Sequence, residues 1–284
     1  MPKSHSGVRR KTKNEPVLAS EMKDIKPTAE YKQEVLVSFE KELDDVGNML
    51  GSPITEKADG DRVNRALREI MTSEDTHVGI RFPESKLDAI LDSGRFKSQF
   101  ETGDSQGSFS PYFRASVEHK EMSYSENMMS EKRPVYGMLF NYKNPSEVKA
   151  SSGAGQQYGN VVAIMKPSIK AHSTITGHDS LDVHGHTMPV PMLRPTWHML
   201  GTGHSHNHIS VLIDAVRAVR KGKPLTVSIF DRHRYAEAQI HGGTATVSNI
   251  QHLIFGGNPP SPAQVARLSR LGITWSLEGE NTIH

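Results

Sequence analysis

Residues 235–243, Tyr-Ala-Glu-Ala-Gln-Ile-His-Gly-Gly, hold four side chains that could do chemistry together. Since side chains alternate between the two faces of a strand, Tyr235, Glu237, Gln239 and His241 would share one face, opposite small apolar side chains. A phenol, a carboxylate, an amide and an imidazole in one row are uncommon in a strand with no polar task. A half-solvated edge strand would show the same alternation. The segment alone supports both interpretations equally, so other parts of the chain have to decide.

Residues 77–82 form a second candidate strand, and this one carries a cation. Its large apolar residues fall on one face, His77 and Arg81 share the other face, and Pro83 ends the strand. The pattern predicts a strand, and its polar face becomes informative only together with the segments that follow.

Two segments rich in hydroxyl groups could line a binding site. Residues 96–107 contain Gln99, Thr102 and Ser105 among glycines, and residues 173–180 are also dense in Ser and Thr. Loops of this composition can present N–H groups and hydroxyls to an anionic ligand, although most such loops only connect elements.

Two further segments between these hydroxyl-rich stretches carry polar groups. Arg114 and Glu118 lie four residues apart on a possible helix, where an ordinary ion pair between them is the simplest expectation. Residues 133–140 read as a strand after a proline, and this strand holds Tyr136 and Gly137.

Seven histidines lie between residues 178 and 208 and invite a metal interpretation. Three prolines make the region a loop, and a metal site would need a further ligand fixed in space and side chains that orient the ligands. Asp179 and Asp182 are available for this. We nevertheless expect these histidines to be polar loop residues and caps, and predict no metal site. They are His178, His184, His186, His198, His204, His206 and His208.

The order of the polar segments resembles the ADP-ribosyltransferase superfamily. Members of that superfamily usually carry an Arg or His on the first core strand, then a Ser/Thr element, then a Glu on a late strand. Here Arg81 and His77, the hydroxyl-rich loops and Glu237 follow in that order.

A closer resemblance covers about residues 76–277. Residues 99–105 (Gln-Phe-Glu-Thr-Gly-Asp-Ser), 133–137 (Arg-Pro-Val-Tyr-Gly) and 235–242, together with Arg114 and Glu118, look like one family of bacterial proteins long classed as a domain of unknown function. That family includes secreted effectors that ADP-ribosylate a threonine of host ubiquitin.

The resemblance implies NAD as co-substrate, bound in the cleft of a split β-sheet. It implies that Arg81 and Glu237 are catalytic. Arg81 would pair with the pyrophosphate or ribose of NAD through its fork of donors. Glu237 would stabilise the positive charge that develops on the ribose as the glycosidic bond breaks. Thr102 and Ser105 would hold the nicotinamide-side ribose or orient the Glu. The other residues placed in the NAD site are His77, Gln99, Tyr136, Gly137 and Gln239, with Tyr136 or Phe100 stacked on the nicotinamide.

Two departures from the superfamily pattern keep alternatives open. Transferases that modify Arg often carry a second acid two positions before the catalytic Glu, where this chain has Tyr235. If Glu237 were that first acid, Gln239 would occupy the catalytic place; we favour Glu237 because the closer family keeps Glu followed by Gln. The Ser/Thr element could be 102–105 or 173–176.

The predicted function is therefore mono-ADP-ribosyl transfer from NAD to a Thr or Ser hydroxyl of a host protein, with ubiquitin as a candidate acceptor. A second hypothesis is a transferase-like fold without NAD chemistry that binds a protein or peptide. A third is a metal-dependent hydrolase that uses the histidines of residues 178–208.

These residues need a mixed fold to bring them together. The pattern of about seven short strands and few helices predicts an α+β protein with a split, perpendicular ADP-ribosyltransferase-like sheet and an N-terminal helical cover. We expect residues 1–27 to be a disordered basic tail, 28–75 the helical cover and 76–284 the catalytic domain. Helices are predicted at 28–50, 61–71, 84–93, 209–221 and 262–271, and further strands at 158–165, 225–230 paired with 235–241, 244–250 (or a turn) and 273–277.

The composition excludes several classes of protein but is compatible with an ADP-ribosyltransferase. The chain has 284 residues and no cysteine, which rules out thiolate nucleophiles, disulfides and Cys-type zinc sites. A net charge of +2 is too weak to argue for nucleic acid. No run approaches the ~18 apolar residues of a membrane span, and a Sec-type signal peptide is not supported. We expect a monomeric bacterial effector, delivered into the host cytoplasm by a non-Sec route, with a host protein as partner and neither nucleic acid nor membrane.

Overall fold

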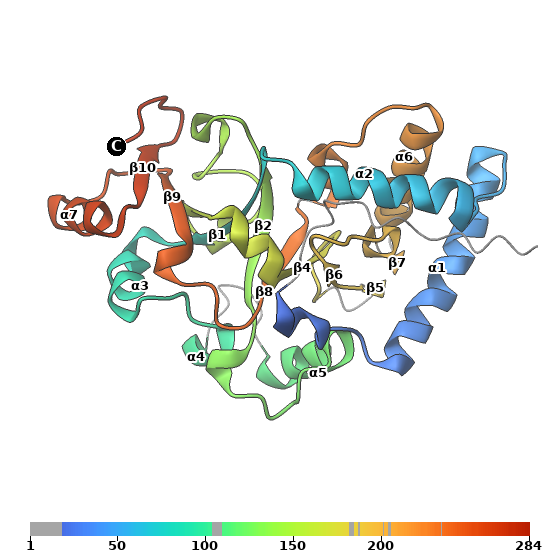
Figure 1. Cartoon of the computed structure of the whole chain (residues 1–284), viewed down its shortest axis with the longest axis horizontal. Coiled ribbons are helices and arrows are strands. Elements are labelled where there is room, and N and C mark those ends of the chain that lie inside the picture. Colours follow the sequence, from blue (N-terminus) through green and yellow to red (C-terminus); the bar gives the residue numbers. More distant parts are fainter. Residues whose placement is uncertain are drawn as a thin grey trace, which may run out of the picture.

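The row of polar side chains around Glu237 lies on an interior strand of an open, mixed sheet of eight strands (Figure 1). The computed structural model describes residues 19–103, 110–181, 185–186, 188–200, 202–203, 206–233 and 235–284. The strand order is β10-β9-β3-β1-β2-β8-β4-β6, and only β9 and β10 are parallel. A mixed fold of helices around a sheet is thereby confirmed. The strands are β1 (Thr76–Phe82), β2 (Val135–Asn141), β3 (Val161–Met165), β4 (Ser173–Thr176), β6 (Val190–Pro191), β8 (Glu237–Ile240), β9 (Ile250–Phe255) and β10 (Thr274–Leu277), and β5 (Gly185–His186) pairs with β7 (Thr202–Gly203) separately.

The two middle strands, β1 and β2, separate part of the way along their length. Their ladder runs from Thr76 opposite Asn141 to Gly79 opposite Met138 and ends there. Beyond this point β1 stays paired with β3, while β2 stays paired with β8. Gly137 lies at the separation, where a Cβ would come within 2.5 Å of the Gly79 carbonyl oxygen. The sheet therefore forks between residues 80–82 and 135–137.

Seven α-helices pack around this sheet in the described part of the chain. Thr28 caps the first helix by accepting a hydrogen bond from the Tyr31 N–H at 3.4 Å, and Gly51 ends it with a left-handed φ of 68°. In Figure 1, α1, α2 and α6 lie together beside β5, β6 and β7, while α3 and α7 lie at the other end of the sheet. The helices are α1 (Ala29–Leu50), α2 (Asp61–Thr72), α3 (Leu87–Ser93), α4 (Gln99–Thr102), α5 (Pro111–Met122), α6 (His206–Arg220) and α7 (Pro262–Leu271).

The apolar core is shared between the N-terminal helices and the sheet. One cluster runs from α1 and α2 through β1, β3 and β9 to α7, and a smaller one lies around Val162 and Ile164 on the opposite face. Residues 19–27, expected to belong to a disordered tail, pack against the body instead: Met22 is 1% exposed and the Ala19 N–H donates to the Ala171 carbonyl. The rest of the expected tail, residues 1–18, lies outside the described residues.

Several elements differ from the sequence-based expectation. The strand expected at 158–165 begins at Val161 after a 3-10 helix, and β4 lies in a segment expected to be a loop. Residues 227–233 form a 3-10 helix instead of the strand expected at 225–230, and β8 pairs with β2 and β4. The strand expected near 244–250 starts at Ile250 and runs to Phe255. No helix among the described residues has the length and apolar character that a membrane crossing requires.

Candidate active site

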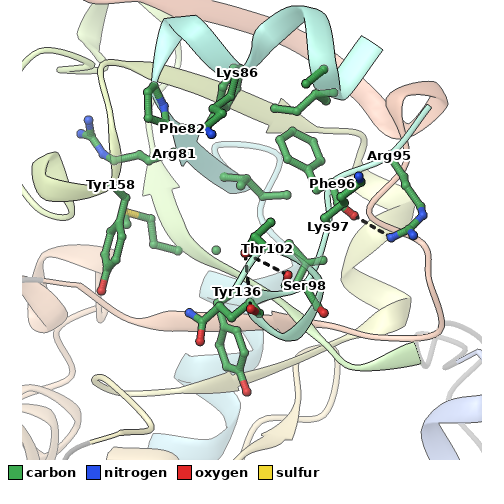
Figure 2. Close-up of a pocket in the computed structure, with 18 of the residues that line it drawn as sticks. Arg81, Phe82, Lys86, Arg95, Phe96, Lys97, Ser98, Thr102, Tyr136 and Tyr158 are labelled. Carbon is green, nitrogen blue, oxygen red and sulfur yellow. Dashed lines mark hydrogen bonds between the residues drawn. The ribbon is translucent and has the colours of Figure 1, made fainter. Parts of the chain in front are cut away.

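A cavity of about 410 Å³ occupies the fork between β1 and β2. Its walls come from these two strands, α3, the segment after α3, α4, α5 and β8 (Figure 2). The volume is within the range of small-molecule sites in proteins. The residues predicted from the sequence that line it are Arg81, Gln99, Thr102, Tyr136, Gly137 and Glu237.

Glu237 contributes a buried carboxylate to the cavity wall. It is 5% exposed, and its Oε1 accepts hydrogen bonds from the Ser180 hydroxyl at 2.5 Å and the Gln239 amide at 2.9 Å. Burial, reinforced by the Asp179 carboxylate, raises the pKa of Glu237 to about 7, while Arg114 and these two donors act in the opposite direction. Glu237 is thus positioned to change its protonation state near neutral pH.

The remainder of the polar row is an interior hydrogen-bond network. Gln239 donates to Glu237 and to the Thr176 hydroxyl at 3.1 Å, and it accepts from Thr174 at 2.8 Å. The two ring nitrogens of His241 lie 2.8 Å from the hydroxyls of Thr174 and Tyr124, and burial lowers the pKa of His241 to about 3. Because β8 lies between β2 and β4, the edge-strand interpretation is wrong. Gln239 was predicted to bind the cofactor, but it does not line the cavity and instead bonds to the Glu237 side chain.

The Ser/Thr candidates lie at different distances from the carboxylate. Thr174 and Thr176 are on β4, next to the strand of Glu237. Thr102 lines the cavity from α4, and its hydroxyl donates to the Ser98 carbonyl at 3.3 Å. The serine that contacts Glu237 is Ser180, which follows β4 and had not been singled out from the sequence.

Arg114 is the cation that the structure brings close to Glu237, and its expected ion pair with Glu118 is not formed. Glu118 instead accepts from Arg133 at 2.5 Å and from the Tyr136 hydroxyl at 2.8 Å. The guanidinium of Arg114 lies 4.2 Å from the centre of the Tyr136 ring and donates to Ser180 at 3.2 Å. Arg114 therefore joins α5 to the site of Glu237.

Arg81 borders the cavity, but its guanidinium is committed elsewhere. It donates to the carbonyls of Ala150 at 2.6 Å, Lys149 at 2.5 Å and Ser152 at 3.0 Å. Figure 2 shows it directed away from the other labelled side chains of the cavity wall. In this state Arg81 anchors the loop 149–152 and does not present its fork of donors to the cavity.

The remaining predicted residues are outside the cavity or outside the described chain. His77 stacks on Tyr142 with ring centres 4.1 Å apart and is not among the lining residues. Ser105 lies outside the described residues, as do the side chains of five histidines between 178 and 208. Within the described part of the chain, no three His, Asp or Glu side chains are grouped closely enough to hold a metal ion.

The two ends of the cavity differ in chemical character. Tyr136, Tyr158 and Tyr235 line it near Glu237, and the Tyr235 hydroxyl donates to Asp179 at 3.2 Å. The segments just before and after α3, together with the end of β1, add basic and aromatic side chains to the wall, which Figure 2 shows among aliphatic and hydroxyl groups. They are Phe82, Lys86, Arg95, Phe96 and Lys97, with Arg95 paired to Glu101.

Fold and site together define a mixed α/β protein with a buried carboxylate in the fork of an open sheet. A family model described as "Protein of unknown function (DUF3626)" matches residues 82–190. The chain is 30% identical over 219 residues to the Gene 2 protein of Mycobacterium phage L5, covering 75% of this chain and 76% of that protein. It is 28% identical over 222 residues to the Gene 2 protein of Mycobacterium phage D29, covering 77% and 79% respectively. The chain therefore belongs to the family of these phage Gene 2 proteins.

Proposed function

We propose that the chain is a mono-ADP-ribosyltransferase that uses NAD and modifies a Thr or Ser hydroxyl of a protein. The observation that carries the proposal is the buried carboxylate of Glu237 in the wall of the fork between β1 and β2. The fork is compatible with the split sheet implied by the resemblance to ADP-ribosyltransferases. The resembling motifs come from β2, α4, α5 and β8, which all contribute to the cavity.

The Glu237 carboxylate can stabilise the positive charge that forms when this reaction breaks its glycosidic bond. The reaction cleaves the bond between the nicotinamide nitrogen and C1′ of the ribose, joins C1′ to the acceptor oxygen, and releases nicotinamide and one proton. Positive charge develops on the sugar in reactions of this class, and a fixed carboxylate stabilises it. The bonds from Ser180 and Gln239 fix the Glu237 carboxylate before any ligand binds.

The uneven polarity of the cavity suits a dinucleotide with a cationic ring and a diphosphate. Carboxylate and tyrosine groups at the Glu237 end favour the nicotinamide ring, because aromatic faces and anions attract a cation. Lys86 and Lys97, together with the aromatic wall of Phe82 and Phe96, favour the adenosine diphosphate half. Arg81 lines the cavity and anchors the loop 149–152, which precedes Tyr158 in the chain, so its role in this proposal is to shape the cavity wall.

The residues of the site support a neutral hydroxyl group as the acceptor of ADP-ribose. Tyr235 occupies the position where transferases that modify Arg carry a second acid, and its hydroxyl is bonded to Asp179. We propose a host protein as the partner, with ubiquitin as one candidate, and delivery of the chain as a monomeric effector by a non-Sec route.

Intact-mass measurement tests this function. The full chain is incubated with NAD and either ubiquitin or a host lysate, and we expect an acceptor protein to gain one ADP-ribose. Glu237→Gln should reduce transfer by about 100-fold or more, as when other transition-state contacts are removed. Glu280→Gln, an exposed residue near the C-terminus, is the matched control and should retain activity. Full transfer by a folded Glu237→Gln variant would overturn the proposal.

The second hypothesis, a protein- or peptide-binding fold without NAD chemistry, is favoured by one observation. The Arg81 guanidinium is occupied by three backbone carbonyls instead of facing the cavity. Calorimetry with NAD separates the two hypotheses, because a ligand that binds the folded state must also raise its thermal stability. No heat and no thermal shift would favour the binding fold.

A further inference from the structure

Arg114 is a buried cation whose hydrogen-bonding capacity is mostly unused. It is 3% exposed and lines the cavity, and its one hydrogen bond within the described chain goes from Nη1 to the Ser180 hydroxyl at 3.2 Å. Its buried Nε has no partner among the described residues. Burying a guanidinium with unsatisfied donors is costly, and residues that are retained at such a cost are often functional.

Ser180 connects this cation to the carboxylate of Glu237. A serine hydroxyl has one proton and two lone pairs, so a hydroxyl that accepts from Arg114 has to send its proton elsewhere. The structure places Glu237 Oε1 2.5 Å from the Ser180 oxygen, where it receives that proton in a charge-assisted hydrogen bond. Arg114 and Glu237 thus favour the same direction of the serine proton, towards Oε1.

All hydrogen bonds to the Glu237 carboxylate converge on one of its two oxygens. Oε1 accepts from the Ser180 hydroxyl, from the Ser180 N–H at 3.4 Å and from Gln239 at 2.9 Å. Oε2 receives no hydrogen bond from any residue that the structure describes, although Glu237 lines the cavity. The arrangement separates a structural oxygen from one that remains for a ligand.

We propose that Arg114 is a positioning residue: it holds the Ser180 hydroxyl, which holds Oε1 of Glu237 and leaves Oε2 for a hydroxyl of the bound ligand. The stacking of Arg114 on Tyr136 supports this role, because Tyr136 is itself fixed by Glu118 and cannot rotate freely. The identity of the ligand rests on the proposed function, whereas the link from Arg114 through Ser180 to Glu237 does not.

A double-mutant cycle tests whether Arg114 acts through Ser180. Arg114→Met and Ser180→Ala should each lower kcat for transfer by about 10- to 100-fold, the usual effect of removing a group that orients a catalytic side chain. The KM for NAD should change by less than about threefold, because Arg114 would not contact the substrate. The double variant should be no slower than the slower single variant, since the two residues form one path.

Conservative variants and a matched control complete the kinetic test. Ser180→Thr keeps the hydroxyl and should recover most of the activity, and Arg217→Met, at an exposed pair with Asp214 on α6, should behave like the wild type. Losses that multiply in the double variant, or a rise mainly in KM, would show that Arg114 contacts the substrate directly and would overturn the inference. If Arg114→Met does not fold, Arg114→Leu, which also lacks a donor, replaces it in the same cycle.

Crystal structures of the variants test the inference without any NAD chemistry. In Arg114→Met (or Arg114→Leu) we expect the Ser180 hydroxyl to leave Glu237 Oε1 and the carboxylate to change its rotamer, with both retained in Arg217→Met. An unchanged contact in the Arg114 variant would overturn the inference even if the protein transfers ADP-ribose. A lost contact in a protein that never turns over NAD would uphold the inference and refute the proposed function.

Discussion

Glu237 is a buried carboxyl group that hydrogen bonds hold in place, and its pKa is raised to about 7. Burial is the main cause of the raised pKa, and the Asp179 carboxylate adds to it. Arg114, Ser180 and Gln239 stabilise the ionised form and keep the pKa of Glu237 from rising further. The carboxylate is therefore held in a state that costs folding energy, as is common at functional sites.

This cost predicts a pH-dependent effect of Glu237→Gln on stability. The pKa of Glu237 is raised from 4.5 to about 7 on folding, so between these values the unfolded chain loses its proton first and the wild type becomes less stable as the pH rises. The Gln side chain does not titrate, so Glu237→Gln lacks this pH dependence. The stability of Glu237→Gln relative to the wild type should therefore increase by about 2–3 kcal/mol between pH 4.5 and pH 8, following the 1.36 kcal/mol per pKa unit.

Urea denaturation of both proteins at several pH values measures this difference, and comparing pH values cancels any pH-independent effect of the lost hydrogen bonds. A difference that stays constant from pH 4.5 to pH 8 would mean that the Glu237 carboxyl titrates in the folded protein as it does in the unfolded chain.

Strand alternation predicted part of the candidate site, and the resemblance to a known family predicted other residues of the cavity wall, such as Gln99 and Thr102. Alternation placed Glu237 and Gln239 on one face of a strand, and the structure confirms that they contact each other. Arg114 was expected to pair with Glu118 from their spacing, but Glu118 is taken by Arg133 and Tyr136. Ser180 ends the hydroxyl-rich segment 173–180, but this segment has no periodic pattern that would single out one of its hydroxyls.

At the scale of elements, helices were easier to predict than strand partners because their signals are local. The capping residue Thr28 and the C-terminal Gly51 predicted both ends of α1 to within one residue. Residues 225–230 alternate like a strand, yet Val227 and Phe230 point into the core three residues apart, as a 3-10 helix requires. In β9, His252 interrupts the apolar pattern because its ring nitrogens bond to hydroxyls of β10, which the sequence does not reveal.

The fork between β1 and β2 depends on two glycines, and they should tolerate substitution unequally. In Gly137→Ala the new Cβ would lie 2.5 Å from the backbone oxygen of Gly79, so a strand has to move. In Gly79→Ala it would meet the Phe140 ring at 2.6 Å, and a side chain can rotate away more easily. We expect Gly137→Ala to cost about 2–3 kcal/mol of unfolding free energy and Gly79→Ala about 1 kcal/mol less, in the range of overpacked interiors.

Chemical denaturation gives both values, and Gly79→Ala is the matched control because it adds the same methyl group to the facing strand. Equal costs at the two positions would indicate that the strands at the fork can shift as easily as the Phe140 ring.

At the scale of the whole molecule, the N-terminal helices are continuous with the rest of the core. Phe39 of α1 packs edge-on against Trp197 with ring centres 5.2 Å apart, and a Cβ at Gly60, just before α2, would come within 2.9 Å of the Trp197 ring. Arg220 of α6 binds Asp59 at 2.8 Å, which ties the segment between α1 and α2 to the helix that follows the histidine-rich region. A boundary between residues 75 and 76 therefore crosses a packed interface.

This shared core predicts that residues 28–75 do not unfold independently. Phe39 and Trp197 are each 1% exposed, so Phe39→Ala opens a cavity between α1 and the rest of the protein and should cost about 3–5 kcal/mol. If α1 and α2 belong to the same cooperative unit as the sheet, calorimetry should show a single transition that moves to lower temperature as a whole. Val37→Ala, at a 56% exposed position two residues earlier on α1, is the control and should leave the transition nearly unchanged. Two transitions, with only the first sensitive to Phe39→Ala, would instead show that the helical cover is a separate folding unit and that the cavity at the fork can form without it.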